Sequence, residues 1–211
     1  MNVCYIVCAL DCKLSIKPDE SDFIIGADRG YFVLENNGIS PDAVIGDFDS
    51  YTGELKCDNV IRFPSRKDFT DSELAIMHAI EKGYKKIKIY GAIGGALDHT
   101  IANLSLLGKY SKQGMEIAFY YDKNVVFALT DGDVSFDESA KGRISVFSFY
   151  DKAFGVFEKG LSYEISDAIL ENKAPLGVSN EFVGECATIS VSKGTLILHT
   201  SMENYENHLT K

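Results

Sequence analysis

Hydrophobic and polar positions along the first part of the chain follow two alternating patterns. Short runs of consecutive apolar residues, typical of buried strands, are separated by segments in which apolar residues recur every three or four positions, which is typical of helices. This alternation predicts an α/β N-terminal domain with a mainly parallel sheet over residues 1–124. The predicted strands are residues 3–10, 23–25, 43–45, 60–63, 86–90 and 116–121.

The segments with helical spacing predict three helices between these strands. The second is the clearest, because Thr70 and Glu73 have the spacing of a capping box at its start and Gly83 follows its end. In the third, Gly108 is expected to end the helix. The predicted helices are residues 31–37, 71–82 and 101–107.

The pattern changes after residue 124. Short runs with strand character follow one another without a long helical stripe, and turn signals separate them at Asp131-Gly132-Asp133 and Lys193-Gly194. This arrangement predicts a C-terminal all-β sandwich over residues 125–211, in which residues 179–182 have the composition of a turn. The predicted strands are residues 125–129, 143–149, 154–158, 187–192 and 195–199.

Composition narrows the possible classes of function. The 211 residues carry a net charge of −10, which argues against a nucleic-acid partner, because affinity for a phosphate backbone depends on clustered Lys and Arg. No apolar run approaches the ~18 residues of a membrane span, so no membrane partner is expected. The five cysteines are odd in number and form no Cys-x-x-Cys pair. They predict neither a zinc site nor a disulfide framework, and they favour a reducing, cytoplasmic setting.

Acidic side chains follow several of the predicted strands. Asp47 and Asp49 come directly after one strand, and Asp28 and Asp98 come after two others. The carboxyl ends of parallel strands lie at one edge of the sheet, where ligands bind in open α/β proteins, so these acids are expected to converge. Asp71 joins them from the first turn of a predicted helix, although a carboxylate there is also a good helix starter.

The grouped carboxylates predict a metal site. Like charges packed together are costly unless a cation lies between them, and Mg²⁺ prefers oxygen ligands from carboxylates and phosphates. The set is larger than one Mg²⁺ normally needs, which leaves open two metal ions or one metal ion with a catalytic base. An Asx-type turn is the alternative for an isolated Asp-x-Asp pair. The predicted catalytic and metal-ligating residues are Asp47, Asp49, Asp71 and Asp98.

A glycine-rich segment containing Gly94 and Gly95 directly precedes the third predicted helix, where backbone N–H groups can approach phosphate. A tight strand-to-helix turn explains this segment equally well, and the spacings of the dinucleotide fingerprint and of the P-loop are both missing. His99, next to Asp98, is a candidate to carry a proton or to hold that carboxylate. Cations near the acidic clusters could neutralise phosphate oxygens. They are Arg29, Arg66 and Lys67.

Taken together, these motifs resemble the thiamine pyrophosphokinase family. The resemblance covers nearly the whole chain, its parts occur in the same order, and the combination is highly specific. The matching segments are residues 27–30, 41–50, 67–75, 91–99 and 102–104 in the first half and residues 160–163 and 176–182 in the second.

The resemblance implies a homodimer with active sites at the subunit interface. It also implies transfer of a diphosphate group from ATP to the hydroxyl of thiamine, with Mg²⁺, to give thiamine diphosphate and AMP. Asp47, Asp49, Asp71 and Asp98 would hold Mg²⁺ and activate that hydroxyl, with Asp98 also at the substrate. The residues implied to lie against the nucleotide are Asp28, Gly30, Lys67, Asp68 and Thr70. Those implied for the thiamine pocket are Tyr163, Ser179 and Asn180.

Two positions depart from the family pattern. The family commonly carries Arg where this chain has Ala96, so one phosphate-facing cation is missing unless Arg66 or Arg29 replaces it. Some members carry Trp where Tyr163 stands; Tyr keeps an aromatic face, so thiamine binding is expected to survive. Two alternatives remain. One is a diphosphokinase for another small heterocyclic alcohol, and the other is a non-catalytic sensor that binds nucleotide or thiamine.

Overall fold

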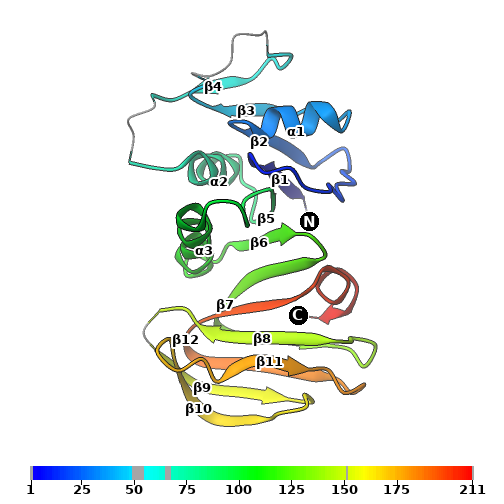
Figure 1. Ribbon diagram of the computed structural model, residues 1–211, viewed down its shortest axis with the longest axis vertical. Helices are drawn as coiled ribbons and strands as arrows, with labels where there is room; N and C mark the ends of the chain where they lie inside the picture. The colour runs from blue at the N-terminus through cyan, green and yellow to red at the C-terminus, as the bar shows by residue number, and fades with distance from the viewer. Residues whose placement is uncertain (1, 49–54, 65–67, 151, 211) are drawn as a thin grey trace. The chain divides into compact units, whose positions relative to one another are not determined.

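The computed structural model describes residues 2–48, 55–64, 68–150 and 152–210. The chain folds into two compact units. The first comprises Met1–Leu106 and Met115–Asp122, and the second comprises Leu107–Gly114 and Lys123–Lys211. The chain combines parallel and antiparallel strands with a few helices (Figure 1). Within the described residues, no helix is both long enough and apolar enough to cross a lipid bilayer.

The first unit is built on a sheet of parallel strands in the order β6-β5-β1-β2-β3-β4. The central strands are apolar along their whole length and almost fully buried, as expected for strands covered on both faces. All six predicted strands are confirmed, and the first is shorter than predicted. The strands are β1 (Val3–Val7), β2 (Phe23–Ala27), β3 (Ala43–Gly46), β4 (Val60–Arg62), β5 (Lys86–Tyr90) and β6 (Glu116–Tyr121).

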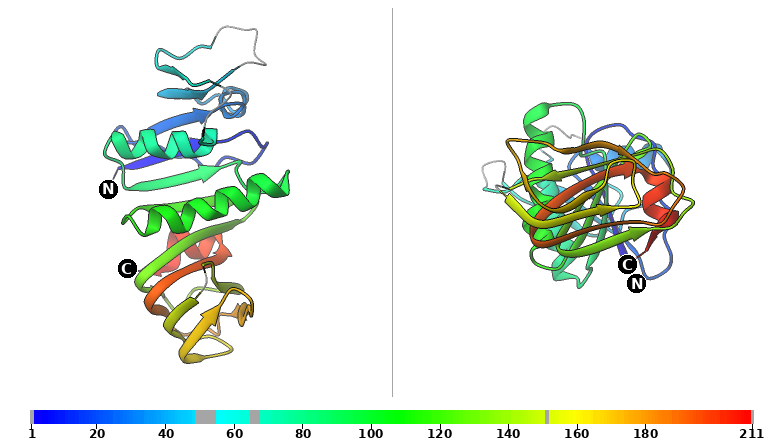
Figure 2. Two further views of the ribbon diagram at one scale, coloured as in Figure 1. Left: turned by 90° about the vertical axis from the view of Figure 1, so that its left-hand side faces the viewer. Right: turned by 90° about the horizontal axis from the view of Figure 1, so that it is seen from below.

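Helices cover both faces of this sheet. α1 (Gly30–Asn36) lies on one face and α2 (Asp71–Glu81) on the other (Figures 1 and 2). Both helices are within one residue of their predicted bounds. The predicted cap of α2 is also present, because Thr70 Oγ1 accepts a hydrogen bond from the Glu73 backbone N–H at 3.2 Å.

α3 (Leu97–Ser111) is longer than predicted, and the expectation that Gly108 ends it is wrong. Gly108 lies inside the helix because a neighbour needs the space that a side chain would fill. A Cβ at this position would lie 2.4 Å from Cε2 of Tyr150, in the same unit. The glycine therefore serves packing rather than termination.

The second unit consists of antiparallel strands. β12 is its longest strand and pairs with β7, β8 and β9; β10 pairs with β9, β11 with β8, and β13 with β7. A short helical turn, Asn204–His208, precedes the last strand. The strands are β7 (Asn124–Phe136), β8 (Arg143–Ser148), β9 (Lys152–Lys159), β10 (Ile165–Glu171), β11 (Gly177–Glu181), β12 (Ala187–Ser201) and β13 (Leu209–Thr210).

The two turn signals predicted in this half are irregularities inside β7 and β12, so the prediction of turns there is wrong. The register of this strand pair shifts between Val191 and Thr195. Asp131 has a φ of 47°, and its Oδ1 accepts a hydrogen bond from the Gly194 N–H at 2.7 Å. Gly and Asp adopt the positive φ of a β-bulge as readily as that of a hairpin turn. Here they form a bulge, because β7 and β12 both continue beyond these residues.

The prediction of a turn at residues 179–182, made from their composition, is also wrong. It belongs mostly to β11, whose Asn180 and Glu181 pair with Ile144 and Arg143 of β8. The turn-like composition reflects a register shift before Asn180, with Ser179 at a φ of 60°. The local backbone is irregular, but the segment still pairs as a strand.

Candidate active site

A cavity of about 430 Å³ opens at the carboxyl ends of the parallel strands in the first unit. The strand order reverses at β1, which lies between β5 and β2, and such a reversal is where open α/β sheets form ligand sites. The segments after these strands and the first turns of α2 and α3 supply the walls. The lining residues that bear on the chemistry of the cavity are Cys8, Asp28, Asp47, Thr70, Asp71, Ser72, Gly94, Ala96, His99 and Asn103.

Among the described residues, three carboxylates line this cavity: Asp28, Asp47 and Asp71. Burial raises the pKa of Asp28, and the negative charges of Asp71 and Asp47 raise it further, against a hydrogen bond from the Arg29 backbone N–H that lowers it. Asp71 and Asp47 are therefore close enough to oppose the ionisation of Asp28. The predicted convergence of acids at the strand ends is present for these three.

The backbone after β2 and the backbone after β3 are packed against each other. Asp28 has a φ of 48° and donates its N–H to the Ile45 carbonyl at 2.7 Å. A Cβ on Gly46 would lie 3.0 Å from the Cα of Asp28, so only glycine lets the two segments approach this closely. The close approach of these two segments places Asp28 and Asp47 on one wall of the cavity.

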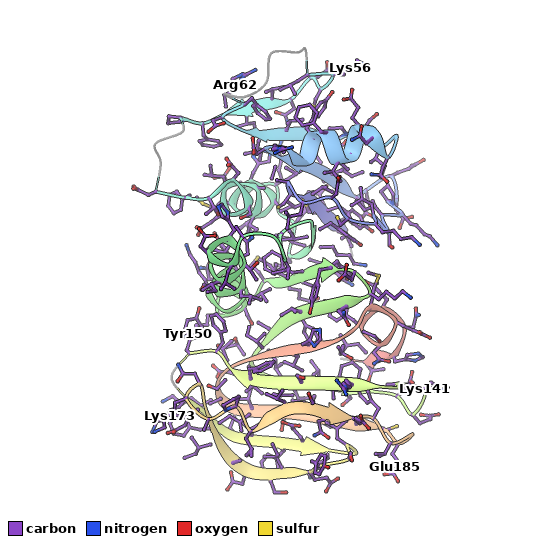
Figure 3. The ribbon with its side chains drawn as sticks, in the orientation of Figure 1. Lys56, Arg62, Lys141, Tyr150, Lys173 and Glu185 are labelled. Carbon is purple, nitrogen blue, oxygen red and sulfur yellow. The ribbon has the colours of Figure 1, made fainter. Side chains whose placement is uncertain are left out.

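The edge of the sheet supports the same region. Phe48 is buried beneath β4, and the guanidinium of Arg62 lies 5.3 Å from the centre of its ring. Arg62 is the last residue of β4 and is exposed, as Figure 3 shows at the labelled side chain. Arg62 is thus a surface residue of an edge strand.

A chain of hydrogen bonds fixes the opposite wall. Ser72 Oγ donates to Asn103 Oδ1 at 2.7 Å, and Asn103 Nδ2 donates to the Ala92 carbonyl at 2.8 Å. Thr70 Oγ1 lies 3.0 Å from Ser72 Oγ. Because Ser72 has one hydroxyl proton and gives it to Asn103, the Thr70 hydroxyl must be the donor in that pair. The network joins α2, α3 and the segment after β5 behind Asp71.

The glycine-rich segment is a tight connection into α3. Gly94 and Gly95 have φ values of 102° and 65°, and Gly94 lines the cavity. Thr100 Oγ1 accepts the Gly94 N–H at 3.3 Å and lies 3.2 Å from the Ala96 carbonyl. The N–H of Gly94 is thus already engaged by the first turn of α3.

Other predicted residues lie elsewhere. Asp98 is exposed in the first turn of α3, its Oδ1 accepts the His99 N–H at 2.8 Å, and of the two only His99 is among the described residues that line the cavity. Consecutive helical positions point about 100° apart, which separates the two side chains. Arg29 and Asp68 are exposed and do not line the cavity either.

Gly30 is buried at the start of α1. A Cβ there would lie 1.8 Å from the Val7 carbonyl oxygen, so the structure gives this glycine a packing role. Asp49, Arg66 and Lys67 lie outside the described residues. Within the described part of the chain, no three His, Cys, Asp or Glu side chains come together as a metal site, so the predicted metal set, which includes Asp49, stays a prediction.

In the second unit, Tyr163 and Asn180 line a separate pocket of about 260 Å³. The Tyr163 side chain is 72% exposed, whereas Asn180 is buried. Ser179 donates its N–H to Ser145 Oγ at 3.0 Å and is exposed. The predicted thiamine residues Tyr163 and Asn180 are thus neighbours, with Ser179 adjacent on β11.

Sequence reasoning gave Cys8, Ser72 and Asn103 no role in the cavity. A signal for Asn103 was available, because it shares the buried stripe of α3 with apolar residues three, four and seven positions later. A polar residue on a buried stripe needs a partner, and Ser72 is that partner. Cys8 is buried and its thiol pKa is raised to about 12 by burial, so it contributes an apolar wall.

The first unit belongs to the class of open α/β proteins that bind ligands at the carboxyl ends of their strands, here with an acidic site. The chain belongs to the thiamine pyrophosphokinase family. It matches the thiamin pyrophosphokinase catalytic domain over residues 17–119 and the vitamin B1 binding domain of the same family over residues 133–196.

Individual relatives agree with this assignment. The chain is 30% identical over 192 residues to thiamine pyrophosphokinase of Bacillus subtilis, covering 88% of this chain and 90% of the relative. It is 26% identical to thiamin pyrophosphokinase 1 of Caenorhabditis elegans, covering 78% and 72% of the two chains. The crystal structure of the Bacillus subtilis enzyme superposes with a TM-score of 0.80 at 28% identity, covering 94% of this chain and 98% of the other. That of an Enterococcus faecalis family protein superposes with a TM-score of 0.82 at 25% identity, covering 94% and 98%.

Proposed function

We propose that this chain transfers a diphosphate group from ATP to the hydroxyl of thiamine, giving thiamine diphosphate and AMP. The observation that carries the proposal is the cavity that collects Asp28, Asp47 and Asp71 at the strand ends of a chain of this family. Transfer of phosphoryl groups depends mainly on positioning and on neutralising charge, which suits a site built from loops on a rigid sheet.

The two parts of the chain would divide the work. Residues 1–124 would form the α/β domain that binds ATP and Mg²⁺, and residues 125–211 a β-sandwich that binds thiamine. The parallel pairing of the first unit, the antiparallel pairing of the second and the two family matches support this division.

The donor set suits a hard divalent cation. Carboxylate oxygens are the ligands that Mg²⁺ prefers, and a cation would relieve the repulsion by Asp71 and Asp47 that adds to the effect of burial on the Asp28 pKa. Bound Mg²⁺ would neutralise charge on the phosphate oxygens as the diphosphate is transferred. The proposed ligands are Asp47, Asp49, Asp71 and Asp98.

The proposed substrate contacts follow the resemblance. Tyr163, with its exposed ring, would pack on a flat heterocycle, with Ser179 and Asn180 beside it and Asp98 at the thiamine hydroxyl. Thiamine is a cation, so the net negative charge of the chain favours its approach. The proposed nucleotide contacts are Asp28, Arg29, Gly30, Arg66, Lys67, Asp68, Thr70, Gly94 and Gly95.

We further propose a homodimer, with active sites at the subunit interface, working in the cytoplasm. The surface of the second unit supports a partner, because Tyr163, Leu176 and Val178 are large apolar side chains left exposed there. All five cysteines are free thiols, which supports a reducing compartment.

The test is AMP release by the purified protein with ATP and Mg²⁺, with and without thiamine. Thiamine-dependent AMP, with thiamine diphosphate as co-product, is the expected result. ADP in place of AMP would point to single phosphoryl transfer. Turnover with a different heterocyclic alcohol in place of thiamine would move the assignment to that substrate, and thiamine binding without product would favour a sensor.

A further inference from the structure

Glu158 is a buried carboxylate with no place in the proposed reaction. It lies in β9, opposite Ile165 of β10 and Ile189 of β12, and its side chain is 0% exposed. Burial raises the pKa of its carboxyl, and the hydrogen bond from Asn180 opposes that shift. Its Oε1 has no hydrogen-bond partner among the described residues. A buried carboxyl group with an unsatisfied oxygen costs free energy of folding, and its one hydrogen bond offsets part of that cost.

That hydrogen bond reaches a different strand. Asn180 Nδ2 donates to Glu158 Oε2 at 2.9 Å, although β9 pairs with β10 and β12 while Asn180 belongs to β11, which pairs with β8. Oε2 can accept this bond whether or not Oε1 carries a proton. The contact therefore joins strands that their backbone pairing leaves apart.

The other hydrogen bonds of Asn180 go to the backbone of Tyr163 and to its own neighbour. Nδ2 also donates to the Tyr163 carbonyl at 2.6 Å, and Oδ1 accepts the N–H groups of Tyr163 at 3.0 Å and of Glu181 at 2.9 Å. Both amide protons and both oxygen lone pairs of Asn180 are then in use. Asn180 holds the main chain of Tyr163 on both sides, so its place in the proposed thiamine pocket is one of packing and not of hydrogen bonding to the ligand.

Gly177 leaves room for this arrangement. A Cβ at Gly177 would lie 2.8 Å from Glu158 Oε1 and 2.6 Å from the Val146 carbonyl. Gly177 lines the same pocket as Tyr163 and Asn180, so the carboxyl of Glu158 lies directly behind the pocket wall. The glycine in this segment is required by the buried acid as well as by the neighbouring strand.

We propose that Glu158 is a positioning residue for the aromatic ring of Tyr163, acting through the side-chain amide of Asn180. The proposal rests on the proposed function, in which Tyr163 packs against thiamine. Oε2 of Glu158 accepts a hydrogen bond, so the NH₂ group of Asn180 must face β9. Its oxygen then faces the N–H groups of Tyr163 and Glu181; with the amide reversed, donors would face donors. A buried acid on β9 thereby helps to hold the main chain from which an exposed ring projects.

Backbone contacts next to Tyr163 show which part of this segment depends on Glu158 and Asn180. The Ser162 N–H donates to the Glu181 carbonyl at 2.9 Å, and Leu161 forms a bridge with Phe182. These bonds hold the segment up to Ser162 without Asn180. The loss of Glu158 is therefore expected to loosen Tyr163 itself and not to detach the segment.

Steady-state kinetics with the full chain give the first test. Glu158→Leu should raise KM for thiamine by at least about tenfold while KM for ATP stays within about twofold, because only the thiamine side loses its positioned ring. Glu158→Gln keeps an oxygen acceptor for Asn180 and should stay within about threefold of the parent for both substrates. Val134→Ala, which opens a cavity in the core of the second unit, controls for general destabilisation and should change neither KM.

A second readout does not depend on activity. The chain has no Trp, so Tyr163→Trp introduces a single tryptophan at the ring in question, which can be excited apart from the tyrosines. Adding Glu158→Leu or Asn180→Ala to this variant should lower its fluorescence anisotropy, and adding Glu158→Gln should not. Glu158→Leu and Asn180→Ala together should lower it no further than either alone, because both break one connection.

The outcomes separate the two proposals. If Glu158→Leu and Asn180→Ala leave both anisotropy and KM for thiamine unchanged, Glu158 has no positioning role. If anisotropy falls as expected but thiamine neither quenches the Tyr163→Trp fluorescence nor is turned over by the parent chain, the positioning device stands and the proposed substrate fails. If Glu158→Leu does not fold, Asn180→Ala and Glu158→Gln carry the same comparison.

Discussion

Ser72 and Asn103 form the hydrogen bond that joins the first turn of α2 to α3 behind the acidic cavity. Both side chains are buried, the Ser72 Oγ to Asn103 Oδ1 distance is 2.7 Å, and the amide nitrogen of Asn103 is bound to the Ala92 carbonyl. A buried polar pair stabilises the elements that it joins only while each of its polar groups has a hydrogen-bond partner.

Replacing Asn103 by Leu is therefore expected to destabilise the protein. The change leaves the Ser72 hydroxyl and the Ala92 carbonyl without their partner, at a cost of about 1–3 kcal/mol in the free energy of unfolding. Urea denaturation measures this loss. Ser105→Ala, which removes an exposed hydrogen bond to the Ile101 carbonyl in the same helix, should change the free energy by less than about 0.5 kcal/mol. Equal losses for the two variants would contradict a structural role for the pair.

Asp71→Asn is expected to lower kcat by at least about 100-fold, because it removes a charge from the cavity without changing side-chain volume. We expect a comparable loss for Asp98→Asn. Thermal unfolding of both variants should match that of the parent. The matched control is Asp58→Asn, an exposed acid before β4 that does not line the cavity. Normal turnover in both test variants would remove the assignment, and normal turnover in Asp98→Asn alone would restrict it to the acids that line the cavity.

The raised pKa of Asp28 makes stability depend on pH. A carboxyl whose pKa is higher in the folded state binds its proton more tightly there, so its unfavourable contribution is missing below the pKa of the unfolded chain and grows as pH rises through the folded pKa. Asp28→Asn should thus be more stable than the parent at pH ~7 without Mg²⁺, and the difference should vanish toward pH ~4. Urea midpoints at the two pH values test this, and a difference that grows on acidification would reverse the sign.

Gly30→Ala is expected to be severely destabilising even without nucleotide. The added Cβ would meet the Val7 carbonyl, a backbone group of a central strand that cannot move aside, and such overpacking costs about 1–3 kcal/mol and occasionally more. Gly132→Ala is the comparison, since its Cβ would meet its nearest atom, the Thr130 carbonyl oxygen, at an ordinary 3.6 Å. If Gly30→Ala melts like the parent and only loses affinity for ATP, the glycine serves the nucleotide and not the packing.

Restoring the arginine that the family commonly carries at position 96 should strengthen nucleotide binding. Ala96 lines the cavity and is exposed to it, so Ala96→Arg would place a guanidinium near the phosphates and should lower KM for ATP by about 3- to 10-fold. Ala102→Arg adds the same charge on an exposed position of α3 away from the cavity and should have no such effect. An equal effect of both variants would point to long-range attraction in place of a local contact.

The strands and helices of the first unit could be predicted because each combines a local pattern with a clear boundary. The caps of α2 and the apolar strands are examples. A short, wholly apolar segment such as Ala43–Gly46 is typical of a strand that is buried on both faces. The third helix was placed from the spacing of Ile101, Leu104 and Leu107, but the stripe that begins at Ile101 is not its buried face. Ile101 is 55% exposed, whereas the stripe that begins at Asn103 is buried. Which of two similar stripes faces the core depends on the partner it meets, here Ser72.

The remaining errors come from signals that different structures share. Positive φ at Asp131 and a glycine at position 194 mark both a hairpin turn and a bulge, and only the pairing of β7 with β12 decides between them. The acids Asp28, Asp47 and Asp71 could be grouped because strand ends converge by topology. The sequence could not show which of Asp98 and His99 faces the cavity, because that depends on the rotation of α3 about its axis.

The position of β1 has a consequence for how the protein is made. β1 leaves the ribosome before the other strands of this sheet, yet one of its two edges pairs with β5, where Val3 lies opposite Lys86. At the ~5–20 residues per second of protein synthesis, that edge waits on the order of 10 s for its partner. An apolar strand with an open edge is a template for aggregation over that interval. The yield of native protein should thus depend on chaperone protection of the nascent chain, and mutations that slow the delivery of β5 should reduce yield without weakening the finished fold.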